Sequence, residues 1–216
     1  RIGHDRVTDH MFLDGLEDAY EPGRLMGSFA EDCAEKYQFT RQAQDEFALA
    51  SLSNALKAQE SGAFDAEISP FEVVSRRTTE IVAADEQPGK ARPEKIPQLK
   101  PAFRKDGTVT PANASSISDG AAALILASQT YAEAHHLPQR ARILGHASHA
   151  QAPGWFTTAP VPAAQKLLER IGWSVADVDL WEVNEAFAVV PMAFMRDMGV
   201  ARDRLNIHGG ACALGH

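Results

Sequence analysis

The stretch NIHGGACALGH, residues 206–216, gathers side chains that could do chemistry: two histidines and one cysteine among three glycines. His208, Cys212 and His216 are four residues apart, so on a helix they would place three zinc ligands on one face. The glycines disfavour a helix there, and no neighbouring residue supplies the fourth ligand that a structural zinc site usually needs. We therefore expect no metal in this stretch.

Two further interpretations concern catalysis. Cys212 could act as a nucleophile beside a histidine base, but a catalytic thiol needs a cation or a helix N-terminus to lower its pKa. Its Ala-Cys-Ala-Leu setting favours a small buried apolar residue instead. Alternatively His216 is the catalytic group, and the glycines let the backbone approach a substrate closely. Spacing alone does not decide between these two.

The elements that must position these residues begin with two helices. Apolar side chains recur every four residues along residues 24–37, which predicts an amphipathic helix. Thr40 is placed to cap a second helix, which begins at residue 41 and ends before Gly62. The side chains that form the apolar stripe of the first helix are Leu25, Phe29, Cys33 and Tyr37.

Different patterns follow along the chain. β-Branched residues within residues 67–82 predict a short strand pair, and the prolines within residues 85–103 predict an extended, exposed loop. The later segments alternate between apolar runs and helical spacing, with Pro191 delaying or kinking the last helix. This order, β-α-β-α-β-α-β, predicts a layered α/β fold. The predicted strands are residues 121–127, 137–150, 177–183 and 204–210, and the predicted helices are residues 128–135, 162–171 and 184–199.

Composition and charge exclude several classes of function. The chain has 216 residues, 44% of them apolar, which is enough for an ordinary buried core. A formal net charge of −8 argues against a nucleic-acid binder, because such binding depends on cations that neutralise phosphates. No apolar run approaches the roughly eighteen residues of a membrane span, and two distant cysteines make no disulfide framework. We therefore expect a cytoplasmic protein without nucleic-acid or membrane partners.

One segment is basic against this acidic background. Residues 90–105 contain six Lys or Arg residues and a single acid, Glu94. A solvated loop is one interpretation, and a contact with a phosphate-bearing ligand is the other. The basic residues are Lys90, Arg92, Lys95, Lys100, Arg104 and Lys105.

Two motifs in order give the chain a resemblance to a known family. NEAFA, residues 184–188, is followed by N-x-x-G-G-A-x-A-x-G-H, residues 206–216. The pair resembles the signature of thiolases, the enzymes that make or cleave 3-ketoacyl-CoA. Other segments, among them RQAQDEFALAS and DVDLWEV, also resemble thiolase sequences, so the resemblance covers essentially the whole chain. Cys212 stands where the family usually has a small apolar residue, which supports its inert interpretation.

The resemblance implies a thiolase-like layered α/β fold, made of two similar halves with a loop domain inserted in the first. It assigns residues 1–116 to most of the loop domain, residues 117–138 to the return into the N-terminal half, and residues 139–216 to the first part of the C-terminal half. The family's acyl-accepting cysteine precedes the loop domain, and its acid/base cysteine follows the glycine-rich turn in a C-x-G motif. Neither is present, so we expect an interior piece with a partial fold.

The resemblance also implies two catalytic residues. Thiolase chemistry moves an acyl group between CoA sulfur and an enzyme cysteine and places negative charge on a thioester oxygen, which needs a base and hydrogen-bond donors. His216 matches the family's catalytic histidine, which activates the nucleophile and donates into the oxyanion hole. Asn184 matches the asparagine that holds a water in that hole. Asn184 could also cap the helix that follows it.

Further positions match residues along the substrate. Ser115 matches a serine beside the pantetheine arm of CoA, and Phe156 stands near the acyl pocket, where the family often has Met. Leu25 stands where short-chain biosynthetic members often have His, which is a departure from their pattern. Core packing is the alternative role for the apolar members of this set. Those expected to line the pantetheine slot are Leu16, Met26, Phe103, Ala186 and Phe187.

The activity implied for the parent protein is that of an acetyl-CoA acetyltransferase, working through an acyl-cysteine by a ping-pong mechanism. The substrates are acetyl-CoA and 3-ketoacyl-CoA, no further cofactor is needed, and the assembly is a homodimer or homotetramer. A 3-ketoacyl-CoA thiolase of β-oxidation, with a broader range of chain lengths, is the alternative. Because both catalytic cysteines are missing, the 216-residue chain alone is expected to be an inactive, CoA-binding piece.

Overall fold

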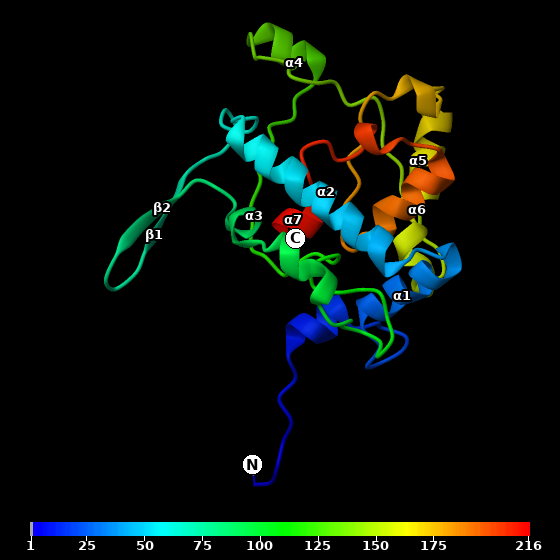
Figure 1. Cartoon of the computed structure of the whole chain (residues 1–216). Helices are drawn as coiled ribbons and strands as arrows, with labels where there is room; N and C mark the ends of the chain where they lie inside the picture. Colours follow the sequence, from blue (N-terminus) through cyan, green and yellow to red (C-terminus); the bar gives the residue numbers. More distant parts are fainter. Residues whose placement is uncertain (1) are drawn as a thin grey trace.

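Helices dominate the computed structural model, which describes residues 2–216 (Figure 1). None of the helices in that range is long and apolar enough to cross a lipid bilayer. In chain order the elements are the π-helical turn η1 (Phe12–Leu16), α1 (Met26–Tyr37), α2 (Arg41–Glu60), β1 (Phe71–Val74), β2 (Thr79–Val82), α3 (Glu86–Lys90), the 3₁₀ turn η2 (Pro93–Gln98), α4 (Gln129–Ala134), the 3₁₀ turn η3 (Pro153–Thr158), α5 (Pro160–Ile171), the 3₁₀ turn η4 (Val175–Asp177), α6 (Val189–Met198), the 3₁₀ turn η5 (Arg202–Arg204) and α7 (Ala211–Leu214).

The main core lies between α1, α6 and η3. Phe29 and Cys33 of α1 are fully buried, as predicted from their four-residue spacing, and Phe194 of α6 belongs to the same core. The Phe29 ring meets Phe156 of η3 edge to face, with centroids 6.2 Å apart. Full burial of a phenylalanine side chain contributes about 1.5–3 kcal/mol to stability. This contact therefore ties two segments distant in sequence.

Helix α2 crosses the middle of the molecule and covers α7 (Figure 1). Its predicted cap is confirmed, because the backbone N–H of Ala43 donates to Thr40 Oγ1 over 3.1 Å. Its end is also as predicted, with Gly62 in the left-handed region at φ 68°. Leu52 and Ala55 of α2 pack on Ala213 of α7, so α2 covers the glycine-rich turn.

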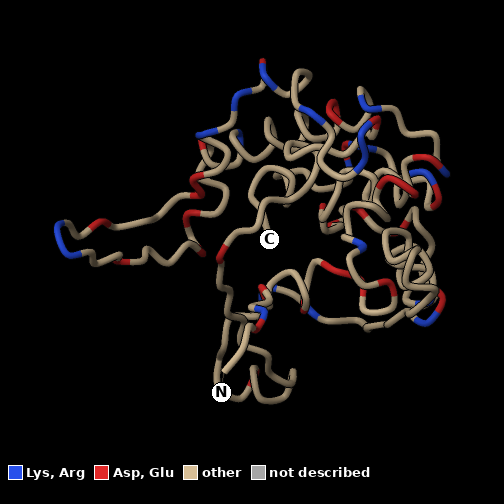
Figure 2. Tube along the Cα trace, turned by 90° about the horizontal axis from the view of Figure 1, so that it is seen from below, with Lys and Arg blue, Asp and Glu red and all other residues tan. Residues whose placement is uncertain are grey.

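The predicted strand pair is confirmed as the antiparallel hairpin β1–β2, in which Phe71 pairs with Val82 and Val74 with Thr79. Figures 1 and 2 show it standing out from the body of the molecule. The turn closes through Ser75, whose N–H donates to the Thr78 carbonyl over 2.8 Å. The basic tip visible in Figure 2 belongs to this turn.

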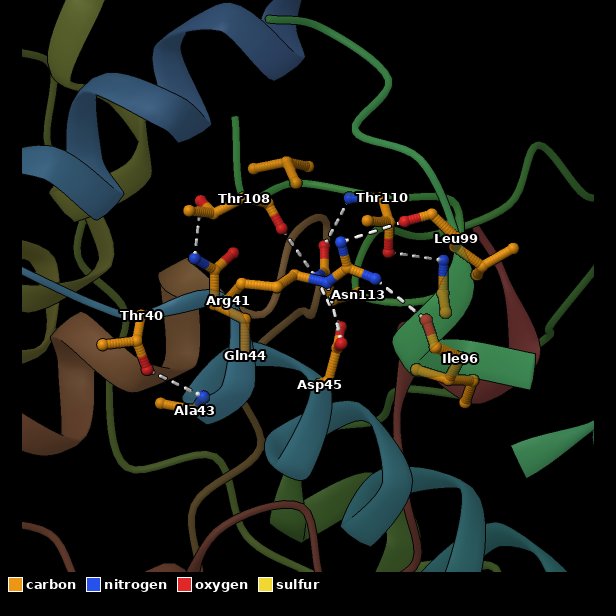
Figure 3. A network of polar contacts seen from close by, with 12 residues as sticks. Thr40, Arg41, Ala43, Gln44, Asp45, Ile96, Leu99, Thr108, Thr110 and Asn113 are labelled. Atoms are coloured by element: carbon orange, nitrogen blue, oxygen red, sulfur yellow. Dashed lines mark hydrogen bonds and ion pairs between the residues drawn. The ribbon is translucent and has the colours of Figure 1, made fainter. Parts of the chain in front are cut away.

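The prediction of an extended, exposed loop over residues 85–103 is wrong in part. Helix α3 and turn η2 lie there, and Pro88 and Ile96 are buried. The cause is a tertiary contact that the sequence pattern does not show. Arg41 at the start of α2 donates to the carbonyl oxygens of Ile96 (2.8 Å) and Leu99 (3.0 Å), which fixes the segment against α2 (Figure 3).

The prediction of four strands in the last hundred residues is wrong for the described structure. Among the described residues of the four predicted strands there is one parallel bridge, between Trp181 and Leu205. Residues 121–127 are exposed, with 89% of Leu124 and 94% of Ile125 accessible. An apolar run becomes a strand only by pairing with a neighbour, and none of the described residues supplies that neighbour to residues 121–127.

The helices predicted in this region are confirmed. Ser128 caps α4 by accepting from the Tyr131 N–H over 3.2 Å, and α5 ends at Gly172 with φ 72°. Helix α6 starts late, at Val189, which places Pro191 in its first turn. Proline is tolerated there because the first N–H groups of a helix have no partner within it.

Candidate active site

Segments from three distant parts of the chain meet in one place. The Ser115 N–H donates to the Ala186 carbonyl over 2.9 Å, and Ala114 forms an antiparallel bridge with Phe187. The His216 N–H donates to the Ser116 carbonyl over 3.1 Å. Four of the predicted site residues, Ser115, Ala186, Phe187 and His216, are therefore brought together by backbone contacts.

The position of the segment before Ser115 is set by buried side chains of α2, shown in Figure 3. Asp45 accepts from Asn113 Nδ2 over 2.9 Å, and Asn113 Oδ1 accepts from the Thr110 N–H over 2.8 Å. The carbonyl of Asn113 then accepts from the Ala188 N–H over 2.8 Å. Helix α2 thus holds residues 110–115 at a fixed place beside the NEAFA segment.

The two predicted catalytic side chains, those of Asn184 and His216, are both exposed. Asn184 precedes α6 by several residues and does not occupy its N-cap, which is Ala188, so the alternative role as the cap of that helix is wrong. Just before His216 the chain passes close to two serines. A Cβ on Gly215 would lie 2.6 Å from Ser116 Oγ and 2.2 Å from Ser118 Oγ, and its φ of 84° also favours glycine.

Most of the apolar residues predicted to line the substrate slot share one cluster. The Phe103 and Phe187 rings meet edge to face with centroids 6.1 Å apart, and Phe103 covers Gly27 so closely that a Cβ there would clash with the ring. Met26, Phe156 and Ala186 are half-buried and pack on the same core. Leu16 lies in η1, half-buried, outside this cluster among the described residues.

Sequence reasoning missed Glu185, which is fully buried between Asn184 and Ala186. Its carboxylate accepts from Ser51 Oγ (2.6 Å), Asn206 Nδ2 (2.8 Å) and the Cys212 N–H (3.1 Å). The available signal was that Glu185 is the one charged residue of the NEAFA motif. Burying a carboxylate costs free energy unless hydrogen-bond donors surround it. The donors Ser51, Asn206 and Cys212 are therefore needed to keep Glu185 at this position.

Cys212 is held in a setting that keeps its sulfur protonated. Burial raises the pKa of its thiol well above the ordinary value, and the adjacent Glu185 carboxylate raises that pKa further. Burial likewise raises the pKa of Cys33. A nucleophilic cysteine needs the opposite shift, so the contacts of Cys212 favour the inert interpretation.

The glycine-rich stretch shows no arrangement of metal ligands. Within residues 2–216, no group of three His, Cys, Asp or Glu side chains is placed to hold a metal ion. The His208 ring instead packs edge to face on Phe64, with centroids 5.3 Å apart. These contacts give His208 a packing role.

The basic segment is divided between paired and exposed cations. Lys90 forms an ion pair with Glu86, and Arg104 pairs with Asp32 of α1. Arg92, Lys95, Lys100 and Lys105 are exposed and take part in no ion pair among residues 2–216. These four cations are therefore free to meet a ligand from solvent.

Two family models match this chain: the thiolase N-terminal domain over residues 1–130 and the thiolase C-terminal domain over residues 137–216. The chain belongs to the thiolase family. The resemblance first drawn from the NEAFA and glycine-rich motifs is thereby confirmed. The division at residues 116 and 138 stays a prediction, as do the roles of the individual site residues.

Curated relatives match this thiolase along its whole length. A probable acetyl-CoA acetyltransferase of Dictyostelium discoideum is 46% identical over 218 residues, which is 100% of this chain and 52% of the relative. Acetyl-CoA acetyltransferase 2 of Arabidopsis thaliana is 47% identical over 100% of this chain and 54% of the relative. The chain spans about half the length of the curated relatives it matches.

Solved structures confirm the expected thiolase-like α/β fold. The acetyl-CoA acetyltransferase of Bacillus anthracis matches with a TM-score of 0.94 and 41% identity, over 100% of this thiolase and 55% of that chain. The Acat5 thiolase of Ascaris suum, solved in complex with coenzyme A, matches with a TM-score of 0.92 and 40% identity over the same shares. The human mitochondrial 3-ketoacyl-CoA thiolase gives 0.92 and 36%, again over 100% and 55%.

Proposed function

We propose that this thiolase chain is part of an acetyl-CoA acetyltransferase, which transfers an acetyl group between CoA thioesters through an acyl-cysteine. The observation that carries the proposal is the meeting of Ser115, Ala186 and His216 at one place, with the His216 side chain open to solvent. The names of the curated relatives support the same activity. The assigned roles follow from this arrangement.

His216 is proposed as the general base and as a donor to the thioester oxygen. An imidazole suits both tasks, because its unperturbed pKa lies near neutrality. Asn184 is proposed to hold a water beside the same oxygen, where a donor stabilises the negative charge that develops in the transition state. The acyl-accepting thiol is proposed to lie outside these residues, because burial raises the pKa of both Cys33 and Cys212.

The half-buried cluster beside Ser115 is proposed as the slot for the pantetheine arm of CoA. Ser115 supplies a hydroxyl at its edge, and Phe156 is proposed to stand nearer the acyl group. The similar Ascaris suum thiolase was solved with coenzyme A bound, which supports a CoA thioester as substrate. The apolar residues proposed for the slot are Leu16, Met26, Phe103, Ala186 and Phe187.

A broader-chain 3-ketoacyl-CoA thiolase of β-oxidation is the second candidate. The likeness to human mitochondrial 3-ketoacyl-CoA thiolase supports it, although with lower identity than the acetyltransferases. For either activity we propose no cofactor besides the CoA thioesters, a homodimer or homotetramer, and a cytoplasmic location.

Binding of coenzyme A to the purified chain tests the proposal, measured by isothermal titration calorimetry. We expect saturable binding that acetoacetyl-CoA competes for, and weaker binding after Ser115→Ala. The matched control is Ser148→Ala, since Ser148 is an exposed serine outside the proposed slot. No saturable binding would overturn the proposal for this chain.

A spectrophotometric assay of acetoacetyl-CoA cleavage, run on the same material, separates binding from turnover. We expect no cleavage above a buffer control, because neither cysteine of the chain offers a reactive thiolate. Cleavage by the chain alone would contradict the proposal that the acyl-accepting thiol lies outside it.

A further inference from the structure

The buried carboxylate of Glu185, the residue after Asn184, accepts hydrogen bonds from three separate parts of the chain. Its Oε2 atom accepts from Ser51 Oγ of α2 over 2.6 Å and from the Cys212 N–H of α7 over 3.1 Å. Its Oε1 atom accepts from Asn206 Nδ2 over 2.8 Å. In each of these three hydrogen bonds a carboxyl oxygen of Glu185 is the acceptor. The surrounding groups are therefore all donors, which suits an ionised carboxylate because it has no proton to donate.

The partners of Glu185 are themselves fixed in orientation. Asn206 donates to the Val183 carbonyl and accepts from the Val183 N–H, both over 2.8 Å, so its amide cannot turn over without losing both bonds. Ser51 donates to Glu185 and accepts from the Gly210 N–H over 2.9 Å. A backbone N–H such as that of Cys212 has no freedom to become an acceptor.

The glycine-rich turn is pressed between this carboxylate and α2. A Cβ on Gly210 would lie 2.5–2.8 Å from the carboxyl atoms of Glu185. A Cβ on Gly209 would lie 2.6 Å from the Ser51 carbonyl oxygen, and the φ of Gly209 is 81°. The two glycines thus let both Glu185 and Ser51 lie directly against the start of α7.

Helix α7 leads within two residues to His216, and Glu185 directly follows Asn184. The Glu185 carboxylate is therefore next to Asn184 in sequence and also bonded to the helix that leads to His216, so it connects the backbone segments of both proposed catalytic residues. We propose that Glu185 is a positioning residue, whose carboxylate, with Ser51, sets residues 209–216 relative to Asn184 so that His216 and Asn184 face the same substrate atom. This inference rests on the proposed function, because it concerns the two residues assigned to the reaction there.

The substitution Glu185→Gln tests the inference, since it keeps the size of the side chain. One carboxyl oxygen becomes an NH₂ group, and it must then face either Asn206 Nδ2 or the donors Ser51 and Cys212. Donor meets donor in both orientations, so the turn has to shift. The matched control is Glu182→Gln, which changes an exposed glutamate three residues earlier in the same way.

The measurement is an NMR spectrum of the full 216-residue chain. We expect E185Q and S51A each to shift the side-chain amide signals of Asn184 and the imidazole signals of His216, whereas E182Q leaves both in place. The double variant E185Q/S51A should shift them by less than the sum of the two single shifts, because the two residues share the Ser51–Glu185 hydrogen bond. S51T, which keeps the hydroxyl, should restore the wild-type signals.

A folded E185Q or S51A chain with unshifted Asn184 and His216 signals would overturn the inference, and S51A with S51T answers the question if E185Q does not fold. Calorimetry with coenzyme A on the same variants separates positioning from general damage. We expect the Kd of E185Q to stay within about twofold of the wild-type value, and a loss of binding would count against positioning. A wild-type chain that binds no coenzyme A would overturn the proposed function, and the NMR shifts would still test the coupling.

Discussion

Cys212 and Glu185 occupy one small volume, and each affects the other. The carboxylate accepts the backbone N–H of Cys212, while the thiol approaches the Glu185 carbonyl at 3.7 Å. A buried negative charge beside a thiol disfavours ionisation of that thiol. Burial, and in addition this neighbouring charge, raise the pKa of the Cys212 thiol and so disfavour its action as a nucleophile.

Alkylation of the native chain measures this effect. The raised pKa of Cys212 means less thiolate at pH 7.5 than in a free cysteine, so iodoacetamide should react much more slowly than with an unfolded chain. The rate should go on rising with pH beyond the ordinary thiol value of about 8.5, where the rate of an unperturbed cysteine levels off. Intact mass spectrometry of wild type and Cys33→Ala follows the modification. Rapid labelling of Cys212 at pH 7.5 would contradict a buried thiol with a raised pKa.

At the scale of elements, local signals predicted the helices and the β1–β2 hairpin, whereas the predicted strands that need a distant partner are wrong. Helix α2 was predictable because its stop and start are encoded within a few residues, by Gly62 and by Thr40. A strand, in contrast, is defined by a partner elsewhere in the chain. Residues 121–127 form the continuous apolar run typical of a buried strand but have no such partner among the described residues, so the apolar run alone misled.

The cap of α2 gives a quantitative test at this scale. Thr40→Ala removes the oxygen that accepts the Ala43 N–H and should lower the free energy of unfolding by about 1 kcal/mol. Thr40→Ser keeps that oxygen and should lie near wild type. Urea denaturation monitored by circular dichroism compares the three chains. Equal losses for T40A and T40S would mean that the methyl group, and not the cap, stabilises the helix.

In the candidate site, too, residues in short motifs could be predicted from the sequence, whereas contacts between distant residues could not. Asn184 and His216 could be proposed from the sequence because their motifs are short and contiguous. Glu185 carried a signal as well, being a charge inside NEAFA, but its three donors come from residues 51, 206 and 212. No pattern along the chain brings those positions together. The supporting contacts of a site are therefore the part that requires the three-dimensional structure.

At the scale of the whole molecule, apolar surface is distributed unevenly. The core between α1 and α6 is well covered, whereas residues 121–127 and the segment around Ile143 lie open. Ile125 is 94% exposed and Ile143 is 67% exposed. Extended, apolar backbone without a neighbouring strand readily pairs with another chain. We therefore expect self-association of this chain in solution.

Ile125→Lys should reduce that self-association, because a charge on an open edge opposes pairing with a second copy. Sedimentation velocity over a range of protein concentrations measures the change. Ser148→Lys adds the same charge at an exposed polar position and should leave association nearly unaltered. Equal reductions in both variants would point to net charge as the cause, and not to residues 121–127.

The hairpin β1–β2 has a consequence of a different kind. Its ladder joins the two strands to each other, and its tip at Arg76 and Arg77 points away from the body of the molecule (Figure 2). Extra residues at such a tip cost only the entropy of closing a longer loop, which grows slowly with length. The tip is thus the natural place in this chain to insert a dye or an affinity tag, so that the protein can be immobilised or followed without altering its core.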